Sequence, residues 1–225
     1  MIVKDIFDML ATGELSAHSW FDSGELDSTR YKKVTLMVQL GLLDLYSRFP
    51  LKTNQLTLVM DECIAKYVLS SKNATGTNPD GYIYDGLVDK FEDDVIQILH
   101  ITDEIGRDLL INSEETYLDI VISGINTLII DNPIHGDALF VTYRASHSRL
   151  VDEHSEIELP YPLVQALLNY VGYKMYSGST DAASTAKANM FYSQYELVCS
   201  QQQMYGNVNE YNDSPSLAFE LGGWV

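Results

Sequence analysis

The chain has 225 residues and 46% of them are hydrophobic, which suffices for one domain with a core, or for one domain carrying an insertion. Its 32 acidic and 14 basic residues give a formal net charge of -18. That charge argues against a protein that grips DNA, because phosphate binding depends on Lys and Arg. It leaves open a protein past which DNA slides without adhering, while solubility is the simpler explanation of the same acidity.

The two cysteines, Cys63 and Cys199, are far apart and belong to no Cys-x-x-Cys or Cys/His cluster. They indicate neither a zinc site nor a disulfide framework, and both are expected to be reduced, packed side chains. Residues 1–8 place acids inside an apolar run, unlike a signal peptide, and no apolar run has the length of a membrane span. We expect a soluble protein kept in a cytoplasm, or packed into a particle assembled there.

The chain begins with helical periodicity. In residues 2–10 apolar side chains recur every three or four positions, with acids between them. A second helix is expected to open near residues 26–28 and to end at Phe49-Pro50, because the residue before proline is pushed out of the helical region. This second helix is apolar on nearly every side, so it is predicted to be the central, most buried one.

After Pro50 the pattern changes to short β-prone segments separated by turn residues. Residues 70–81 are rich in Asn, Thr, Gly and Pro, which indicates an exposed loop. The expected strands are 55–60, 64–69, 95–102, 109–111, 126–130 and 138–144. Short strands at this close spacing predict a small antiparallel sheet or sandwich.

Helical periodicity returns at Leu159-Pro160, where proline suits the first turn of a helix. The buried stripe of this helix is predicted to be Leu163, Leu167, Val171 and Met175. Residues 177–181 make a turn and cap a last helix that runs to about Met204. The predicted inner face of that last helix is Ala183, Ala186, Met190, Phe191, Tyr195 and Val198.

Helices from both ends of the chain must share one core, so the predicted fold class is α+β. Residues 1–52 and 149–204 are expected to form an α-helical bundle, interrupted by an antiparallel β insertion at residues 53–148. Residues 205–225 are expected to form an extended C-terminal arm.

The arm lacks the periodicity of a buried helix. Within it, Leu217, Phe219 and Leu221 would lie on one face of an extended strand. Such a face must be buried, and addition to the sheet edge of another subunit is one way to bury it. Trp224 is a candidate terminal anchor, since buried aromatics dominate interface energies. These four are the candidate docking residues, and the alternative is a tail that folds back on its own subunit or stays disordered.

Three tyrosines, Tyr170, Tyr173 and Tyr176, recur at three-residue spacing on one predicted helix. Tyrosine is enriched at protein interfaces, so they are candidates for a contact with a neighbouring subunit. The alternative is an ordinary bundle core with hydroxyl groups that reach its rim.

No pattern of residues indicates catalysis, a metal or a cofactor. The histidines include no pair at helical i, i+4 spacing, and His147 and His154 are expected to lie on a solvated loop. No phosphate-binding glycine loop is present, and nucleophile, base and oxyanion groups cannot be assembled. We therefore expect a protein without enzymatic activity, without a metal site and without a cofactor.

The later elements resemble those of a known family. The residues that carry the resemblance are Val95-Ile-Gln-Ile-Leu-His-Ile-Thr-Asp-Glu-Ile-Gly-Arg-Asp108, Asn126-Thr-Leu-Ile-Ile130, Leu139-Phe-Val-Thr-Tyr-Arg-Ala145 and Ile157-Glu-Leu-Pro-Tyr-Pro-Leu-Val-Gln-Ala-Leu-Leu-Asn-Tyr-Val-Gly-Tyr-Lys-Met-Tyr176. In this order they resemble the head-to-tail adaptor, or connector, proteins of short-tailed bacteriophages, of the tail-tubular-protein-A type. The likeness covers residues 95–204 and, more weakly, the first two helices.

The resemblance implies a structural virion protein of the neck and tail complex, assembled in the host cytoplasm. Family members form a ring, usually of twelve copies, that joins the portal protein of the DNA-filled head to the tail nozzle. The implied partners are other copies of the chain, the portal, and tail nozzle or tail fibre proteins. DNA passes through the channel without specific binding, and no membrane is involved. Residues 180–225 would reach the portal or a neighbouring subunit, with both partners open.

A ring of twelve copies at -18 each would carry -216 formal charges. An acidic lumen repels the DNA backbone and lets it pass without adhering. The candidate channel-lining residues are Glu92, Asp93, Asp94, Asp103, Glu104, Glu114 and Glu115. Alternatives to the adaptor are another tail-complex component, such as a nozzle or stopper protein, and a small hydrolase or carbohydrate-binding β module.

Overall fold

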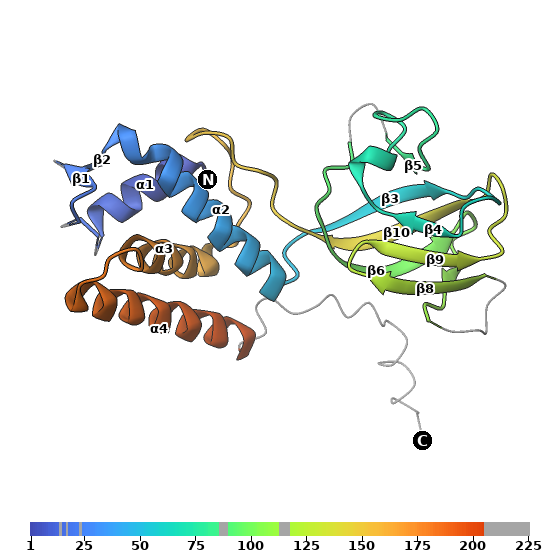
Figure 1. Ribbon diagram of the computed structural model, residues 1–225. Coiled ribbons are helices and arrows are strands. Elements are labelled where there is room, and N and C mark those ends of the chain that lie inside the picture. The colour runs from blue at the N-terminus through green and yellow to red at the C-terminus, as the bar shows by residue number, and fades with distance from the viewer. Residues whose placement is uncertain (14, 17, 23, 86–89, 113–117, 205–225) are drawn as a thin grey trace, which may run out of the picture. The chain divides into compact units, whose positions relative to one another are not determined.

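The computed structural model describes residues 1–204 except 14, 17, 23, 86–89 and 113–117. Its four α-helices and antiparallel sheets confirm the predicted α+β class. The chain divides into two compact units, one formed by Met1–Pro50 with the chain from Leu150 onward, the other by Leu51–Arg149. The second unit corresponds to the β insertion, which was predicted at residues 53–148. Figure 1 shows the helices in the first unit and the main sheets in the second.

The helical unit contains α1 (Val3–Thr12), α2 (Tyr31–Arg48), α3 (Tyr161–Tyr176) and α4 (Ala182–Met204). Two short strands, β1 (Phe21–Asp22) and β2 (Glu25–Leu26), and the 3-10 helix η1 (Ser28–Arg30) connect α1 to α2. The start of α1 is held by the segment that precedes α3, because the Val3 N–H donates to the Ser155 carbonyl at 3.1 Å. The two ends of the chain thus fold together in this unit.

The central helix of this unit is α3, and the prediction that the second helix is the most buried one is wrong. The predicted stripe of Leu163, Leu167, Val171 and Met175 is buried, and α3 contacts both α2 and α4. Figure 1 shows α3 between those two helices. As a result α2 and α4 each bury mainly the side that faces inward, as their buried residues show.

Glycines bring the helices close at two points. A Cβ on Gly41 of α2 would lie 2.7 Å from Leu167 Cδ1, and a Cβ on Gly172 of α3 would lie 2.9 Å from Phe191 Cδ1. Real Cβ atoms do not approach other atoms so closely. Close packing therefore favours glycine at these two positions, although each glycine destabilises its helix by about 1 kcal/mol relative to alanine.

The β unit contains two sheets whose strand pairs are antiparallel. The five-stranded sheet has the order β5-β3-β10-β6-β7, and the three-stranded sheet has the order β4-β9-β8. One hydrophobic cluster draws on both sheets, with members such as Leu58, Ile101 and Ile130. The bounds are β3 (Thr53–Val59), β4 (Lys66–Val68), β5 (Ile83–Tyr84), β6 (Val95–Asp103), β7 (Asp108–Leu109), β8 (Asp119–Gly124), β9 (Thr127–Asp131) and β10 (Ala138–Ala145), with the 3-10 helix η2 at Ser71–Asn73.

Each of the six expected strands corresponds to one of these, whereas β5 and β8 were missed. The predicted exposed loop at 70–81 is partly packed, because Ala74 is buried and the Asn73 side-chain amide donates to the Val68 carbonyl at 2.9 Å.

None of the helices in the described part of the chain has the length and apolar character needed to cross a lipid bilayer.

Candidate functional site

The side of α4 that faces away from α3 is largely exposed and mixes apolar residues with the uncharged polar residues Ser193, Gln194 and Gln201. Met190, Leu197 and Met204 follow one another at seven-residue intervals, which places them on one face of a helix. Their exposed fractions are 45%, 57% and 85%. Ala183 and Ala186 are exposed near the start of the same helix. We call these five residues the α4 outer face.

The prediction for the inner face of the last helix is therefore partly wrong. Phe191 and Tyr195 are buried as expected, but Ala183, Ala186 and Met190 are exposed. The residues that α4 buries are Ala188, Phe191, Tyr195 and Cys199. Because α4 packs mainly on α3, a single stripe at helical spacing suffices for that contact, and the other apolar residues of α4 remain uncovered.

The α4 outer face also has little charge around it. Lys187 and Glu196 are the only charged residues among the 23 of α4, in a chain with a net charge of -18. Glu196 is paired with Arg48 of α2 at 2.8 Å. Depletion of charged residues distinguishes the core of a protein interface from the rest of a surface.

A second exposed apolar face lies on α2. Leu36, Leu40 and Leu43 are spaced as i, i+4 and i+7, and they are 60%, 42% and 40% exposed. We call these three residues the α2 outer face. The opposite side of α2 carries Gly41, which packs against Leu167 and Tyr170 of α3. Large apolar side chains on contiguous exposed surface mark interaction sites more often than isolated ones do.

The predicted tyrosine stripe packs within the chain. The rings of Tyr170 and Tyr195 have centroids 5.4 Å apart, and those of Tyr173 and Tyr192 are 5.1 Å apart. Tyr176 stacks on Phe191 at 5.9 Å. These contacts join α3 to α4, which favours the core alternative over a subunit contact for this stripe.

A polar network joins α2 to α4 near their C-terminal ends. Arg48 donates to both carboxylate oxygens of Glu196 at 2.8 Å, and its Nε lies 2.9 Å from Asp44. The hydrogen bonds from Arg48 lower the pKa of Glu196. The Tyr195 hydroxyl donates to Asp44, and burial together with this bond raises the pKa of Tyr195. The network therefore keeps Glu196 ionised and Tyr195 neutral near pH 7.

Most of the described acids proposed for a channel are bound by their own unit. Asp94 accepts hydrogen bonds from Tyr143 at 2.9 Å and from Asn54 at 3.0 Å. Asp93 accepts from the Ser71 N–H at 2.7 Å, and Glu104 accepts from the Ala138 N–H at 2.8 Å. Glu92 is exposed. Glu114 and Glu115 lie outside the described residues.

Asp103 is poorly placed to line a channel, because its side chain is buried. The side chain accepts from the Arg107 N–H at 2.9 Å, from Arg107 Nε at 2.7 Å and from the Ile105 N–H at 3.1 Å. Burial opposes ionisation, but these bonds prevail and lower the pKa of Asp103. The carboxylate thus closes the turn between β6 and β7, and it presents little negative surface.

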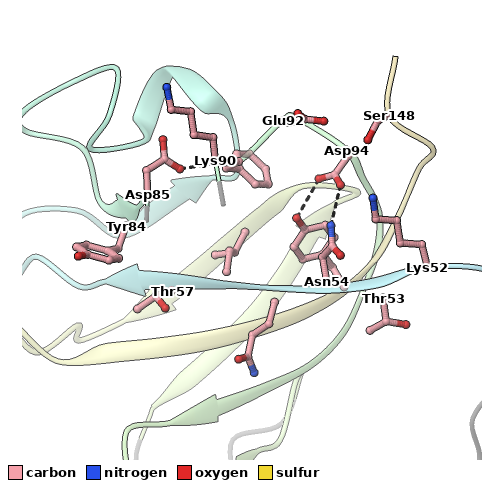
Figure 2. Close-up of a pocket in the computed structure, with 14 residues that line it drawn as sticks. Lys52, Thr53, Asn54, Thr57, Tyr84, Asp85, Lys90, Glu92, Asp94 and Ser148 are labelled. Carbon is pink, nitrogen blue, oxygen red and sulfur yellow. Dashed lines mark hydrogen bonds between the residues drawn. The ribbon is translucent and has the colours of Figure 1, made fainter. Parts of the chain in front are cut away.

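The β unit carries one large polar cleft, shown in Figure 2. Its volume is about 700 Å³, and β3, β5 and residues 90–94 contribute to its lining. Asp94 points toward Asn54 in this view, and it also accepts from the Tyr143 hydroxyl at 2.9 Å. Asp85 accepts from the Phe91 N–H at 3.0 Å. Asp94 thus holds the end of this segment against β3, while Asp85 holds Phe91 close to the end of β5.

The remaining residues singled out in the sequence are the histidines and the docking candidates. His154 is exposed, but His147 is buried, with Nδ1 2.7 Å from the Ser148 carbonyl oxygen, so the expected solvated loop is wrong for His147. Within the described ranges, no three His, Cys, Asp or Glu side chains converge as a metal site would require. The docking candidates Leu217, Phe219, Leu221 and Trp224 lie outside the described residues.

Comparison with protein-family models found no match, and comparison with curated proteins found none either.

Sequence reasoning missed both outer faces because it assigned most of their residues to the core, including Ala183, Ala186 and Met190 of α4. The available signal was the excess of apolar residues. The 18-residue helix α2 is apolar on nearly every side, but it contacts its neighbours on one side only. It therefore cannot bury all of its apolar side chains within its own unit.

Proposed function

We propose that the chain is a structural virion protein, a ring-forming head-to-tail adaptor that joins the portal to the tail and surrounds the path of the DNA. The observation that carries this proposal is the pair of exposed apolar faces on one helical unit, the α2 and α4 outer faces. In a monomer, the described residues leave both faces exposed to water.

The faces support self-assembly because of what surrounds them. Each copy has a net charge of -18, so copies repel one another over most of their surface. The α4 outer face is nearly free of charge, and on α2 Arg48 partly offsets the charge of Asp44, from which its Nε lies 2.9 Å away. These two faces are therefore where copies can meet with the least repulsion and with the largest gain from apolar burial.

The choice of an adaptor among self-assembling proteins rests on the sequence resemblance of residues 95–204. Two features agree with it. The two ends of the chain fold together in a helical unit while residues 51–149 form a separate β unit. The chain is also strongly acidic, which suits a channel that DNA must cross without adhering.

The experiment is to mix the purified chain with portal rings from short-tailed phages. Images of the particles and their mass should show a second ring of fixed copy number on the portal. A matched mixture with the Leu40→Glu and Leu197→Glu double variant is the control for assembly through the outer faces. Portals that stay bare with the unaltered chain would overturn the adaptor function.

A further inference from the structure

We propose that the α2 outer face of one copy packs against the α4 outer face of the next copy, so that subunits join head to tail. This assignment rests on the proposed function for its premise that the chain assembles with itself. It adds which two surfaces meet and what symmetry follows.

The two faces point in different directions. The α2 outer face lies on the side of α2 opposite Gly41, which contacts α3, and the α4 outer face lies opposite Phe191 and Tyr195, which also contact α3. Figure 1 shows α3 between the two helices. One copy therefore presents two separate surfaces, and a single neighbour cannot cover both through a twofold contact of like faces.

Symmetry then selects the arrangement. In a twofold dimer the same patch meets itself, so pairing α2 with α2 would leave the α4 outer face in water on both copies. Pairing the α2 face of one copy with the α4 face of the next covers both faces on every copy. Repetition of such a heterologous contact generates a ring when the rotation closes, and an open filament when it does not.

The two surfaces differ in the size of their side chains. Three leucines form a ridge on α2, while the α4 outer face combines small Ala183 and Ala186 with two flexible methionines, which adapt to a partner. Lys32 and Lys33 are exposed next to the α2 face, and Asp181 is exposed at the start of α4. Lys187 is also exposed on α4, so the margin of the contact carries charges of both signs.

The available area favours a ring over an isolated pair. A helix of 23 residues is about 34 Å long and about 10 Å wide, so its outer face projects roughly 340 Å². A stable dimer commonly buries about 800 Å² on each partner. One such contact is small, whereas each member of a closed ring makes two, and closure holds every subunit at both faces.

Disulfide trapping tests the pairing in the full-length chain. Exposed Cys63 is first replaced by Ser, while buried Cys199 remains. Single variants Leu40→Cys and Leu197→Cys are then oxidised separately and as a mixture, and Leu43→Cys with Met190→Cys forms a second pair. The substituted side chains are all exposed, so the fold should tolerate them. Lys4→Cys, on the exposed side of α1, replaces Leu40→Cys in the control mixture.

We expect covalent dimers in the mixture of at least one pair, few in either single variant, and a ladder of larger products when one chain carries both cysteines. Dimers that form as readily from Leu40→Cys alone would show a twofold contact and overturn the proposal. Absence of trapping in both pairs beyond the Lys4→Cys control would also overturn it.

The outcome separates this inference from the proposed function. If rings assemble on a portal but these crosslinks do not form, the pairing of the α2 and α4 outer faces is wrong while the adaptor function stands. A crosslinked ladder from a chain that never binds a portal would keep the faces and remove the adaptor function.

Discussion

Arg48 and Glu196, which are 148 positions apart in the sequence, form a two-pronged ion pair with both N···O distances at 2.8 Å. The pair joins α2, before the β unit, to α4, after it. An Arg–carboxylate pair of this geometry is stronger and more directional than a single hydrogen bond. It therefore helps to hold α4 against α2 in the helical unit, whose two outer faces we propose to mediate assembly.

The first prediction concerns this pair. Glu196→Gln keeps the shape of the side chain but removes its charge, so the free energy of unfolding should fall by about 0.5–1 kcal/mol, as for partly exposed ion pairs. Denaturant unfolding measures the change, and added salt should reduce it. Asp8→Asn, at an exposed position of α1, is the control and should leave stability unchanged. Equal effects of both substitutions would show that only net charge matters.

The second prediction concerns the close approach of α3 and α4. Gly172→Val places new atoms against the Phe191 ring, where even a Cβ would lie at 2.9 Å, so it should cost about 1–3 kcal/mol of stability. Gly178→Ala is the matched control, because a Cβ there meets nothing within 4 Å. Thermal unfolding compares the two. A Gly172→Val protein as stable as the unaltered chain would contradict the packing described for these helices.

The third prediction separates structure from charge among the acids of the β unit. Asp94→Ala leaves the buried Tyr143 hydroxyl without its acceptor, which should cost about 1–3 kcal/mol. Asp94→Asn retains a carbonyl acceptor and should cost less. Glu92→Ala removes the same charge from an exposed side chain two residues away and should be near neutral. If Asp94→Ala and Glu92→Ala have the same effect on unfolding, the hydrogen bonds of Asp94 contribute nothing.

The fourth prediction concerns acid. Asp181 accepts hydrogen bonds from the Ser179 hydroxyl and from the Ser184 N–H, the latter at 2.8 Å, and these lower its pKa from 3.8 to about 2. Because the folded-state pKa is depressed, this stabilisation is full above about pH 4 and is lost as the pH falls toward 2. The difference in unfolding midpoint between the chain and Asp181→Asn should therefore shrink over that range. A constant difference would contradict a capping role.

Helices and strands with a clear periodic pattern could be predicted from the sequence, whereas short strands could not. The α3 stripe from Leu163 to Met175 was predictable, because i, i+4 spacing on a helix determines which side can be covered. β8 was overlooked although Ile120-Val121-Ile122 is a run of β-branched residues, which favour strands. β5 has only two residues and gives almost no periodic signal.

The outer faces could not have been located from the sequence. Apolar residues such as Leu36 and Met190 look alike whether they are buried by their own chain or by a neighbour. Only the packing of α2 and α4 against α3 separates the two groups. The burial of Asp103 likewise depends on the close return of Arg107 in a tight turn, which composition does not reveal.

The fifth prediction tests the outer faces by charge. Leu40→Glu and Leu197→Glu each place a carboxylate where a neighbour should lie, so self-association should weaken at least tenfold, which corresponds to about 1.4 kcal/mol. Stability of the monomer should hardly change, because both positions are exposed. Thr12→Glu, on α1, adds the same charge elsewhere and should leave association intact. Association equally insensitive to all three changes would exclude these faces from the contact.

The most direct test of the central claim is the mass of the full-length chain in solution, measured alone over a wide range of concentrations and again with a portal ring. We predict that a closed oligomer of fixed copy number forms at the expense of the monomer, either unaided or on the portal. A chain that remains monomeric under both conditions would contradict the account.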